Sequence, residues 1–169
     1  VRPETKFGDK YVVMHPDDAR YKEYQHGDKL VVEWINGPIE ATIIKDPVMD
    51  MEFGTGVMTI TPWHSQVDYE LAEKYKLDIE QIIDEEGKLL PIAKEFAGME
   101  INEAREKIVE KLAAKGLLVK VEEHYENTKK VCYKCETVIE PQARDQWFVK
   151  MKPLAELALN AVRDNKEIN

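Results

Sequence analysis

Cysteine, long apolar runs and excess positive charge are all scarce in this sequence. Only two cysteines occur among 169 residues, which excludes a disulfide-stabilised scaffold and indicates a reducing, cytoplasmic setting. No hydrophobic run approaches the length that spans a bilayer and no signal-peptide pattern is present, so we expect no membrane association. Lys and Arg number 24 against 33 Asp and Glu, and the net charge of −9 argues against a broad nucleic-acid footprint. A short contact with one end of a nucleic acid is still compatible with this charge.

A strict alternation of strands and helices is also missing, which counts against a Rossmann fold. Many short β-rich runs and few helices instead favour an α+β fold, with a twisted mixed sheet or open β-barrel core and a few peripheral helices. Strands are expected at residues 10–15, 29–35, 39–45, 57–61, twice within 79–90, and at 117–125, 137–139 and 147–149; helices are expected at 17–24, 66–76, 102–115 and 153–163.

The length suits one domain, 1–169, with a CxxC-containing return segment at about 125–150 and a terminal helix at 153–164. The chain opens without Met in what reads as the middle of a motif and closes on a charged tail. We therefore expect a monomeric module of a longer protein.

A glycine turn followed by a short strand opens the most informative stretch, residues 53–68. Gly54 and Gly56 flank Thr55, so the backbone there can adopt positive φ or approach a ligand closely. Residues 57–61 then alternate in the manner of a strand. A glycine turn alone is a weak indication of a site.

The helix start after this strand carries the sharpest candidate residue. Ser65 is a good N-cap, and Asp68 three residues later completes a pair that resembles a capping box. From spacing alone, capping is the favoured role of Asp68. Capping is compatible with a second role in ligand binding, because a carboxylate held ionised at a helix N-terminus can also bind a substrate ammonium.

Other side chains near this helix start have both functional and ordinary interpretations. His64 suggests a general base, but no partner completes a triad and no Gly-x-Ser-x-Gly elbow exists, so a turn residue is favoured. Thr59 and Thr61 share a strand face, which ordinary strand propensity explains. Phe53 and Trp63 suit stacking on a base, although such aromatics usually belong to a core.

Cys132 and Cys135 have the spacing of one arm of a zinc knuckle. A complete site needs four ligands, and His124 is the nearest other candidate. The chain thus offers half a zinc site, whose remaining ligands would lie outside it. A redox CxxC is disfavoured, because no thioredoxin-like βαβ pattern surrounds it.

Five groups of motif residues occur in one order along nearly the whole chain. They are Arg2-Pro-Glu-Thr5 with Phe7-Gly-Asp9, His15-Pro-Asp-Asp18 with Tyr21, Asp50 to Gly56, Thr61-Pro-x-His64 with Asp68-Tyr-Glu70, and Val138 to Pro141 with Gln146 to Met151. Together they resemble the editing insertion of the class I aminoacyl-tRNA synthetases. The last group, with the CxxC before it, resembles the valyl type rather than the isoleucyl and leucyl types.

The resemblance implies hydrolysis of mischarged tRNA, chiefly threonyl-tRNA(Val), without a covalent intermediate and without a cofactor for editing. Its partners would be the tRNA(Val) 3′ end carrying threonine and the remainder of the synthetase. Asp68 would bind the α-amino group, Phe53 would pack on the terminal adenine, Arg2 would lie near the 3′ end, and Thr61 would line the pocket. The implied catalytic group is Asp68, Thr61 and His64, and the implied substrate contacts are Arg2, Phe53, Gly54, Thr55, Gly56, Thr59 and Ser65.

Three positions depart from the pattern of that family. Thr59 stands where a lysine is expected, Ser65 where an aspartate is expected, and Trp63 where a small residue is expected. The first two changes remove one cation and one anion together. They suggest, as an alternative, a tRNA-end-binding module with weak or no hydrolysis. Two further alternatives are a structural insertion whose CxxC completes a zinc knuckle with the rest of the synthetase, and an editing domain of the isoleucyl or leucyl type.

Overall fold

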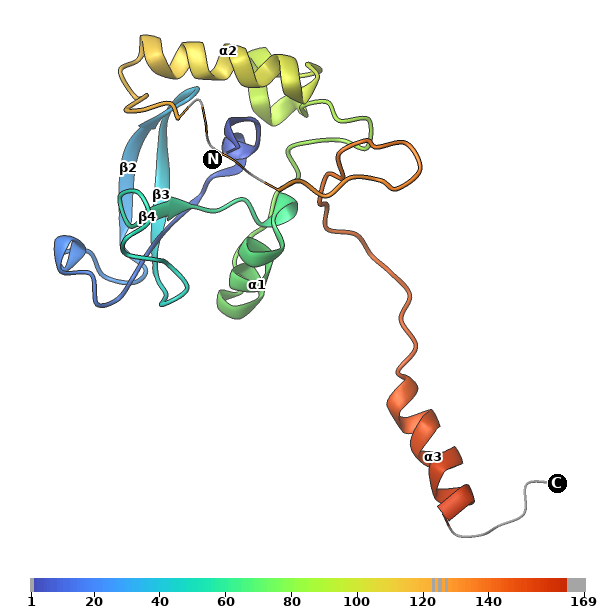
Figure 1. The fold of residues 1–169 in the computed structure, drawn as a ribbon. Coiled ribbons are helices and arrows are strands. Elements are labelled where there is room, and N and C mark those ends of the chain that lie inside the picture. Colours follow the sequence, from blue (N-terminus) through green and yellow to red (C-terminus); the bar gives the residue numbers. More distant parts are fainter. Residues whose placement is uncertain (1, 123, 125, 127, 164–169) are drawn as a thin grey trace.

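A four-stranded sheet lies at the centre of the computed structural model, which describes residues 2–122, 124, 126 and 128–163 (Figure 1). The strands are β1 (Tyr11–Met14), β2 (Lys29–Trp34), β3 (Gly37–Lys45) and β4 (Val57–Thr59), in the order β2-β3-β1-β4. β1 pairs parallel to β3 and antiparallel to β4, while β2 and β3 form an antiparallel hairpin. The predicted α+β class with a mixed sheet is confirmed, and the sheet does not close into a barrel.

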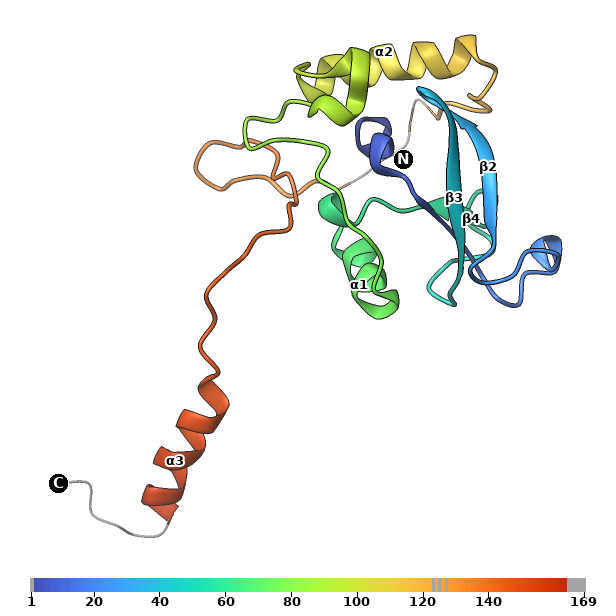
Figure 2. The ribbon, with the colours of Figure 1, turned by 180° about the vertical axis from the view of Figure 1, so that it is seen from behind.

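Helices surround the sheet without covering it evenly. The longer ones are α1 (Gln66–Tyr75), α2 (Ile101–Ala114) and α3 (Met151–Arg163), and the short 3₁₀ helices are η1 (Pro3–Gly8), η2 (Ala19–Tyr21), η3 (Pro62–His64) and η4 (Pro91–Phe96). In both ribbon views α2 lies across one end of the β2–β3 hairpin, and α1 lies below it beside the end of β4 (Figures 1 and 2). The predicted helices at 66–76 and 102–115 are thus confirmed to within a residue or two.

β1 is buried on both faces, which explains why its sequence is almost continuously apolar. Val13 packs on one face in a cluster that includes Leu71 of α1. Val12 and Met14 pack on the opposite face in a cluster with Ile43. Because successive side chains of a strand point to opposite faces of the sheet, β1 contributes to two small hydrophobic cores, one on each face.

The hairpin loop begins earlier and is shorter than the expected strands at 29–35 and 39–45 imply. Trp34 pairs with Gly37, so the loop consists of Ile35 and Asn36 instead of running through residues 36–38. Gly37, with φ of 104°, is already the first residue of β3. A glycine is suited to this position because positive φ costs it little.

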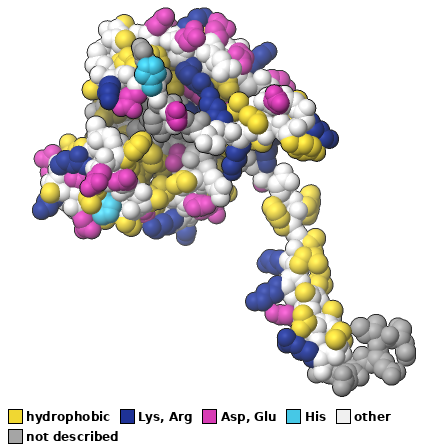
Figure 3. Space-filling model, in the orientation of Figure 1, with side chains coloured by type: hydrophobic (Ala, Val, Ile, Leu, Met, Phe, Trp, Pro, Cys, Tyr) yellow, Lys and Arg dark blue, Asp and Glu magenta, His cyan; other side chains and the backbone are white. Residues whose placement is uncertain are grey.

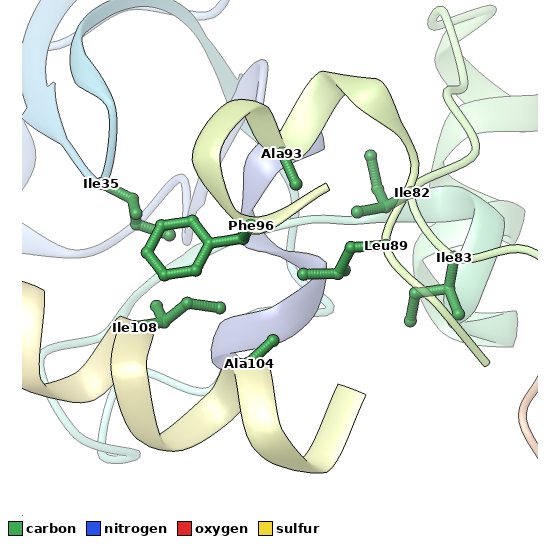
Figure 4. Packing of buried hydrophobic residues seen from close by; sticks show 8 residues of the cluster. All are labelled: Ile35, Ile82, Ile83, Leu89, Ala93, Phe96, Ala104 and Ile108. Atoms are coloured by element: carbon green, nitrogen blue, oxygen red, sulfur yellow. The ribbon is translucent and has the colours of Figure 1, made fainter. Parts of the chain in front are cut away.

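The third cluster contains four of the eight largest fully buried side chains (Figure 4). It joins the end of the hairpin, the segment before α2, and α2 itself; its members are Ile35, Ile82, Ile83, Leu89, Ala93, Phe96, Ala104 and Ile108. Ala104 and Ile108 occupy successive turns on one face of α2, as the buried stripe of an amphipathic helix requires. This packing fixes α2 over η1 and the ends of the strands.

The predictions of strands at 79–90, 117–125, 137–139 and 147–149 are wrong for the residues that the structure describes; residues 123 and 125 lie outside them. Isolated β-bridges occur in place of the strands expected at 79–90 and 137–139. They pair Ile83 with Leu89, Lys88 with Glu100, and Val131 with Val138. Val119 and Trp147 are 97% and 102% exposed, so their apolar neighbourhoods do not pack against a sheet. Alternating apolar residues form a strand only where a neighbouring strand supplies hydrogen bonds.

Residues 128–163, called the C-terminal arm below, end in α3, which projects away from the rest of the molecule in both ribbon views (Figures 1 and 2). The helix begins at Met151, two residues before its predicted start, and predicted residue 164 lies outside the described residues. Its hydrophobic side chains gather along one side and its Lys and Arg side chains along the other (Figure 3). Within the described ranges, no helix combines the length and apolar character needed to cross a membrane.

Candidate functional site

The start of α1 holds Asp68 in a buried position. The Oγ of Ser65 accepts a hydrogen bond from the backbone N–H of Asp68 at 3.4 Å, so the predicted N-cap is present. The Asp68 carboxylate does not complete the box on Ser65; its Oδ2 accepts from the backbone N–H of Thr61 at 2.8 Å. The 3₁₀ turn η3 brings the end of the strand segment back over the helix start and so allows this bond. Burial raises the pKa of Asp68 above its usual value.

Two threonine hydroxyls meet beside this carboxylate. Thr61 is 4% exposed, and its Oγ1 lies 3.2 Å from the Oγ1 of Thr5 in η1. Thr5 in turn donates to the carbonyl oxygen of Arg2 at 3.0 Å. The N-terminal motif and the strand-to-helix motif, 56 residues apart in sequence, are therefore joined in one buried polar cluster.

His64 is held by backbone groups on both ring nitrogens. Its Nε2 accepts from the N–H groups of Ile82 and Ile83 at 3.1 and 3.2 Å, and its Nδ1 lies 3.3 Å from the carbonyl oxygen of Pro141. This pattern requires a neutral ring with the proton on Nδ1. Burial lowers the pKa of His64 to about 4, consistent with the neutral form. The ring thus ties three segments together and has no free nitrogen to accept a proton from a water molecule.

Lys6 and Asp9 of the N-terminal segment extend this polar cluster, and neither was predicted as a site residue. The Nζ of Lys6 donates to the Oγ1 of Thr59 at 2.8 Å and to its carbonyl oxygen at 3.2 Å. Asp9 is 4% exposed, and neither of its carboxylate oxygens has a hydrogen-bond partner in the described residues. Burial raises the pKa of Asp9 to about 7. The sequence contains little indication of a role for these two residues, because they are simply two charged residues in or beside the N-terminal motif.

The glycine turn lies at the other end of β4 and is supported by η2. Gly54 and Gly56 have φ values of 59° and 71°, as predicted for this turn. A Cβ on Gly56 would lie 2.3 Å from the guanidinium of Arg20, so only glycine fits there without displacing that side chain. The hydroxyl of Tyr21 donates to the carbonyl oxygen of Thr55 at 2.7 Å. Phe53 is 65% exposed, which leaves its ring available for stacking.

A buried carboxylate anchors the first residues of the chain. Glu4 is fully buried and accepts from the guanidinium of Arg105 at 2.8 and 3.1 Å and from Arg2 at 3.1 Å. Burial raises the pKa of Glu4, but the hydrogen bonds from Arg105 and the two positive charges outweigh it and lower the pKa overall. Arg2 also donates to Glu140 at 2.5 Å. The guanidinium of Arg2, a predicted substrate contact, is therefore paired with two carboxylates in this structure.

Residues 140–144 of the C-terminal arm fold back over η3. The N–H of Ala143 donates to the carbonyl oxygen of Trp63 at 3.1 Å, next to the contact between His64 and Pro141. A cleft of about 290 Å³ lies there, lined by Pro62, Trp63, Ser65, Gln66, Tyr69, Pro141, Gln142, Ala143 and Arg144. It includes Ser65, the N-cap of α1, but not Asp68.

Cys132 and Cys135 lie in a tight turn of the arm, closed by a 2.8 Å hydrogen bond from the N–H of Cys132 to the carbonyl oxygen of Thr137. The hydrogen bond with the Thr137 hydroxyl lowers the pKa of Cys135. In the described part of the chain, no third Cys, His, Asp or Glu joins these thiols in a group that could hold a metal ion. The two thiols therefore fit zinc only with ligands from elsewhere.

The chain is similar to bacterial valine–tRNA ligases. It is 46% identical over 165 residues to that of Fusobacterium nucleatum, 44% over 165 residues to that of Carboxydothermus hydrogenoformans, and 41% over 167 residues to that of Thermotoga maritima. These alignments cover 98–99% of this chain, but the chain spans only 18–19% of the length of those relatives. No protein-family model matches the chain.

Proposed function

Since this chain is homologous along nearly its whole length to one segment of the valine–tRNA ligases, we infer that it is an editing domain. The proposed reaction is hydrolysis of the ester that links a wrong amino acid to tRNA, chiefly in threonyl-tRNA(Val). Water adds to the ester carbonyl and the bond to the ribose oxygen breaks, which gives free threonine and tRNA.

The physical need for such a reaction is specific to this amino acid pair. A hydrophobic pocket that accepts valine cannot strongly reject threonine, which merely replaces a methyl by a hydroxyl; valyl-tRNA synthetase is the known example, with a discrimination of about a hundredfold. A second pocket that hydrogen-bonds the hydroxyl corrects this weakness, because its polar groups stay unpaired when valine enters.

The observation that carries the proposal is the state of the Asp68 carboxylate. In the part of the chain that the structure describes, Oδ2 accepts a hydrogen bond from the N–H of Thr61 and Oδ1 accepts none, which leaves Oδ1 for an incoming ammonium group. The carboxylate is 9% exposed at the end of β4, where water screens charge poorly. An aminoacyl ester carries a free α-ammonium, and its pairing with Asp68 would hold the ester carbonyl beside Thr61 and Thr5.

The remaining site residues are proposed to position the tRNA and the pocket walls. The exposed ring of Phe53 is suited to pack on the terminal adenine, beside a turn whose backbone can approach the sugar closely. Arg2, at the edge of the pocket, would exchange Glu140 for a phosphate of the 3′ end. His64 would act structurally, because both of its nitrogens are bound to backbone groups.

The decisive experiment measures deacylation of threonyl-tRNA(Val) and of valyl-tRNA(Val) by the whole protein that carries this chain. We expect threonine to be released and valine to be spared. Asp68→Asn keeps an acceptor for the Thr61 N–H but removes the charge, so it should reduce threonine release at least about a hundredfold without unfolding the protein. Glu70→Gln, on the exposed side of the same helix, is the matched control and should leave the rate unchanged.

The outcomes separate editing from simpler roles. Release of neither amino acid by the wild-type protein, together with retained binding of the tRNA 3′ end, would identify a binding module and contradict the proposal. An Asp68→Asn variant that unfolds would show that the carboxylate serves the fold through Thr61. Asp68→Glu then tests the charge in a folded protein, and it should retain measurable hydrolysis.

A further inference from the structure

The pocket contains one ammonium group that editing as proposed above does not use. Lys6 extends from η1 to β4, 53 positions away in sequence, and its side chain is only 13% exposed. Two of its N–H groups are donated to the hydroxyl and the carbonyl oxygen of Thr59. A lysine has three donors, so one donor remains for another partner.

A buried carboxylate stands behind this ammonium. The Oδ2 of Asp9 lies 3.7 Å from the Nζ of Lys6, close enough for charge attraction but too far for a hydrogen bond. Both oxygens of Asp9 are buried without a hydrogen-bond partner in the described chain. Such a group is costly to bury, and the neighbours that favour its charged form are the ammonium of Lys6 and the side chain of Thr59, both of which lower the pKa of Asp9 against the larger effect of burial.

Lys6, Asp9 and Asp68 act on one another electrostatically. The charge of Lys6 lowers the pKa of Asp68, which opposes the larger effect of burial. The charge of Asp68 raises the pKa of Asp9, which adds to the larger effect of burial. The charge of Lys6 therefore acts on both carboxylates, while its Nζ donates to the hydroxyl of Thr59. A ligand with an ammonium and a separate hydroxyl is complementary to this arrangement.

We propose that Lys6 reads the side-chain hydroxyl of the aminoacyl group, while Thr59 and Asp9 position its ammonium. The inference rests on the editing function proposed above. In this arrangement Asp68 binds the α-ammonium and the free donor of Lys6 binds the hydroxyl of threonine. Valine offers no acceptor, so its entry would leave that donor unpaired in a buried pocket. Thr59, an uncharged strand residue, would then contribute to selection through the lysine that it holds.

The test is the ratio of the two deacylation rates in the whole protein, with threonyl-tRNA(Val) and valyl-tRNA(Val) as substrates. Lys6→Met keeps the length of the side chain and removes its charge. It should lower the threonyl rate about 10- to 100-fold, the range expected from losing one hydrogen bond to a charged group. The slow valyl rate should not fall in parallel, so the ratio of the two rates should fall by a similar factor.

Two further variants keep the outcome interpretable. Thr59→Val removes the hydroxyl that orients Lys6 without changing the shape of the strand residue. It should lower the ratio of the threonyl to the valyl deacylation rate several-fold. This variant replaces Lys6→Met as the test if Lys6→Met does not fold. Lys29→Met removes an exposed lysine that pairs with Glu40 and should change neither rate. A wild-type ratio in both Lys6→Met and Thr59→Val, or parallel loss of both rates in both variants, would overturn the role of Lys6. Inactivity of the wild-type protein would instead contradict the editing function itself.

Discussion

The body of the molecule, residues 2–116, and the C-terminal arm, residues 128–163, use apolar side chains in opposite ways. In the described residues every fully packed hydrophobic side chain, from Val12 to Ile108, belongs to the body. In the arm, Trp147, Phe148 and Leu157 are more than two-thirds exposed. The periodicity of α3 was sufficient to specify a helix, but a helix becomes part of a core only where another element covers its apolar face.

The largest expected effect is the loss of a side chain from the core of the body. Ile108 is completely buried between α2 and the segment around Phe96, so Ile108→Ala should lower the free energy of unfolding by about 2–5 kcal/mol. Urea unfolding of the 169-residue chain measures this change. Val109→Ala, one residue along the same helix and only partly buried, is the control and should cost clearly less. Equal losses would mean that α2 does not dock as described.

A smaller effect is expected at the buried ion pairs that join η1 to α2. Glu4→Gln should cost about 1–3 kcal/mol, because Arg105 and Arg2 would lose their charged partner in a buried position. The pKa of Glu4 is lowered in the folded state, so its stabilising contribution is complete above the unfolded pKa near 4.5. That contribution is lost as the pH falls through the lower, folded-state pKa.

The pH dependence provides the matched comparison for Glu4. Unfolding free energies of the wild type and of Glu4→Gln should converge as the pH falls below about 4.5, the unfolded-state value. A constant difference between pH 7 and pH 3 would show that the carboxylate is not ionised against Arg105. Such a result would also weaken the description of the body as a unit held by specific buried contacts, on which its contrast with the arm depends.

The smallest effect is expected in the arm. Leu157 is 71% exposed on α3, so Leu157→Ser should change the unfolding free energy of the chain by no more than about 0.5 kcal/mol. The same urea experiment applies. A loss above about 1 kcal/mol would show that α3 packs against the body in solution, and the contrast between the two regions would then be false.

Local patterns identified the elements that depend on nearby residues. The strands at β1, β2 and β3, the helices α1 and α2, the glycine turn and the Ser65 cap all follow from spacing and residue type. The strands expected in the arm failed because an alternating pattern does not reveal whether a neighbouring strand exists. The hairpin turn was displaced because Asn36-Gly37 allows positive φ both within the loop and at the start of a strand.

The candidate site shows the same limit at the level of side chains. Asp68, Thr61 and the turn at Gly54 lie within one stretch, and their positions could be predicted together. The contact of Lys6 with Thr59 joins positions far apart in the chain, so no local sequence pattern predicts it. The neutral state of His64 depends on the backbone of Ile82 and Ile83, whose approach only the folded structure reveals.

The contacts of residues 140–144 also determine what the loss of the arm would do to the site. The arm meets η3 through the bond from Ala143 to Trp63 and through the contact of Pro141 with His64. These contacts support the backbone that immediately follows Thr61, whose N–H binds the Asp68 carboxylate. A truncation before residue 140 would therefore remove a support of that carboxylate along with the exposed helix.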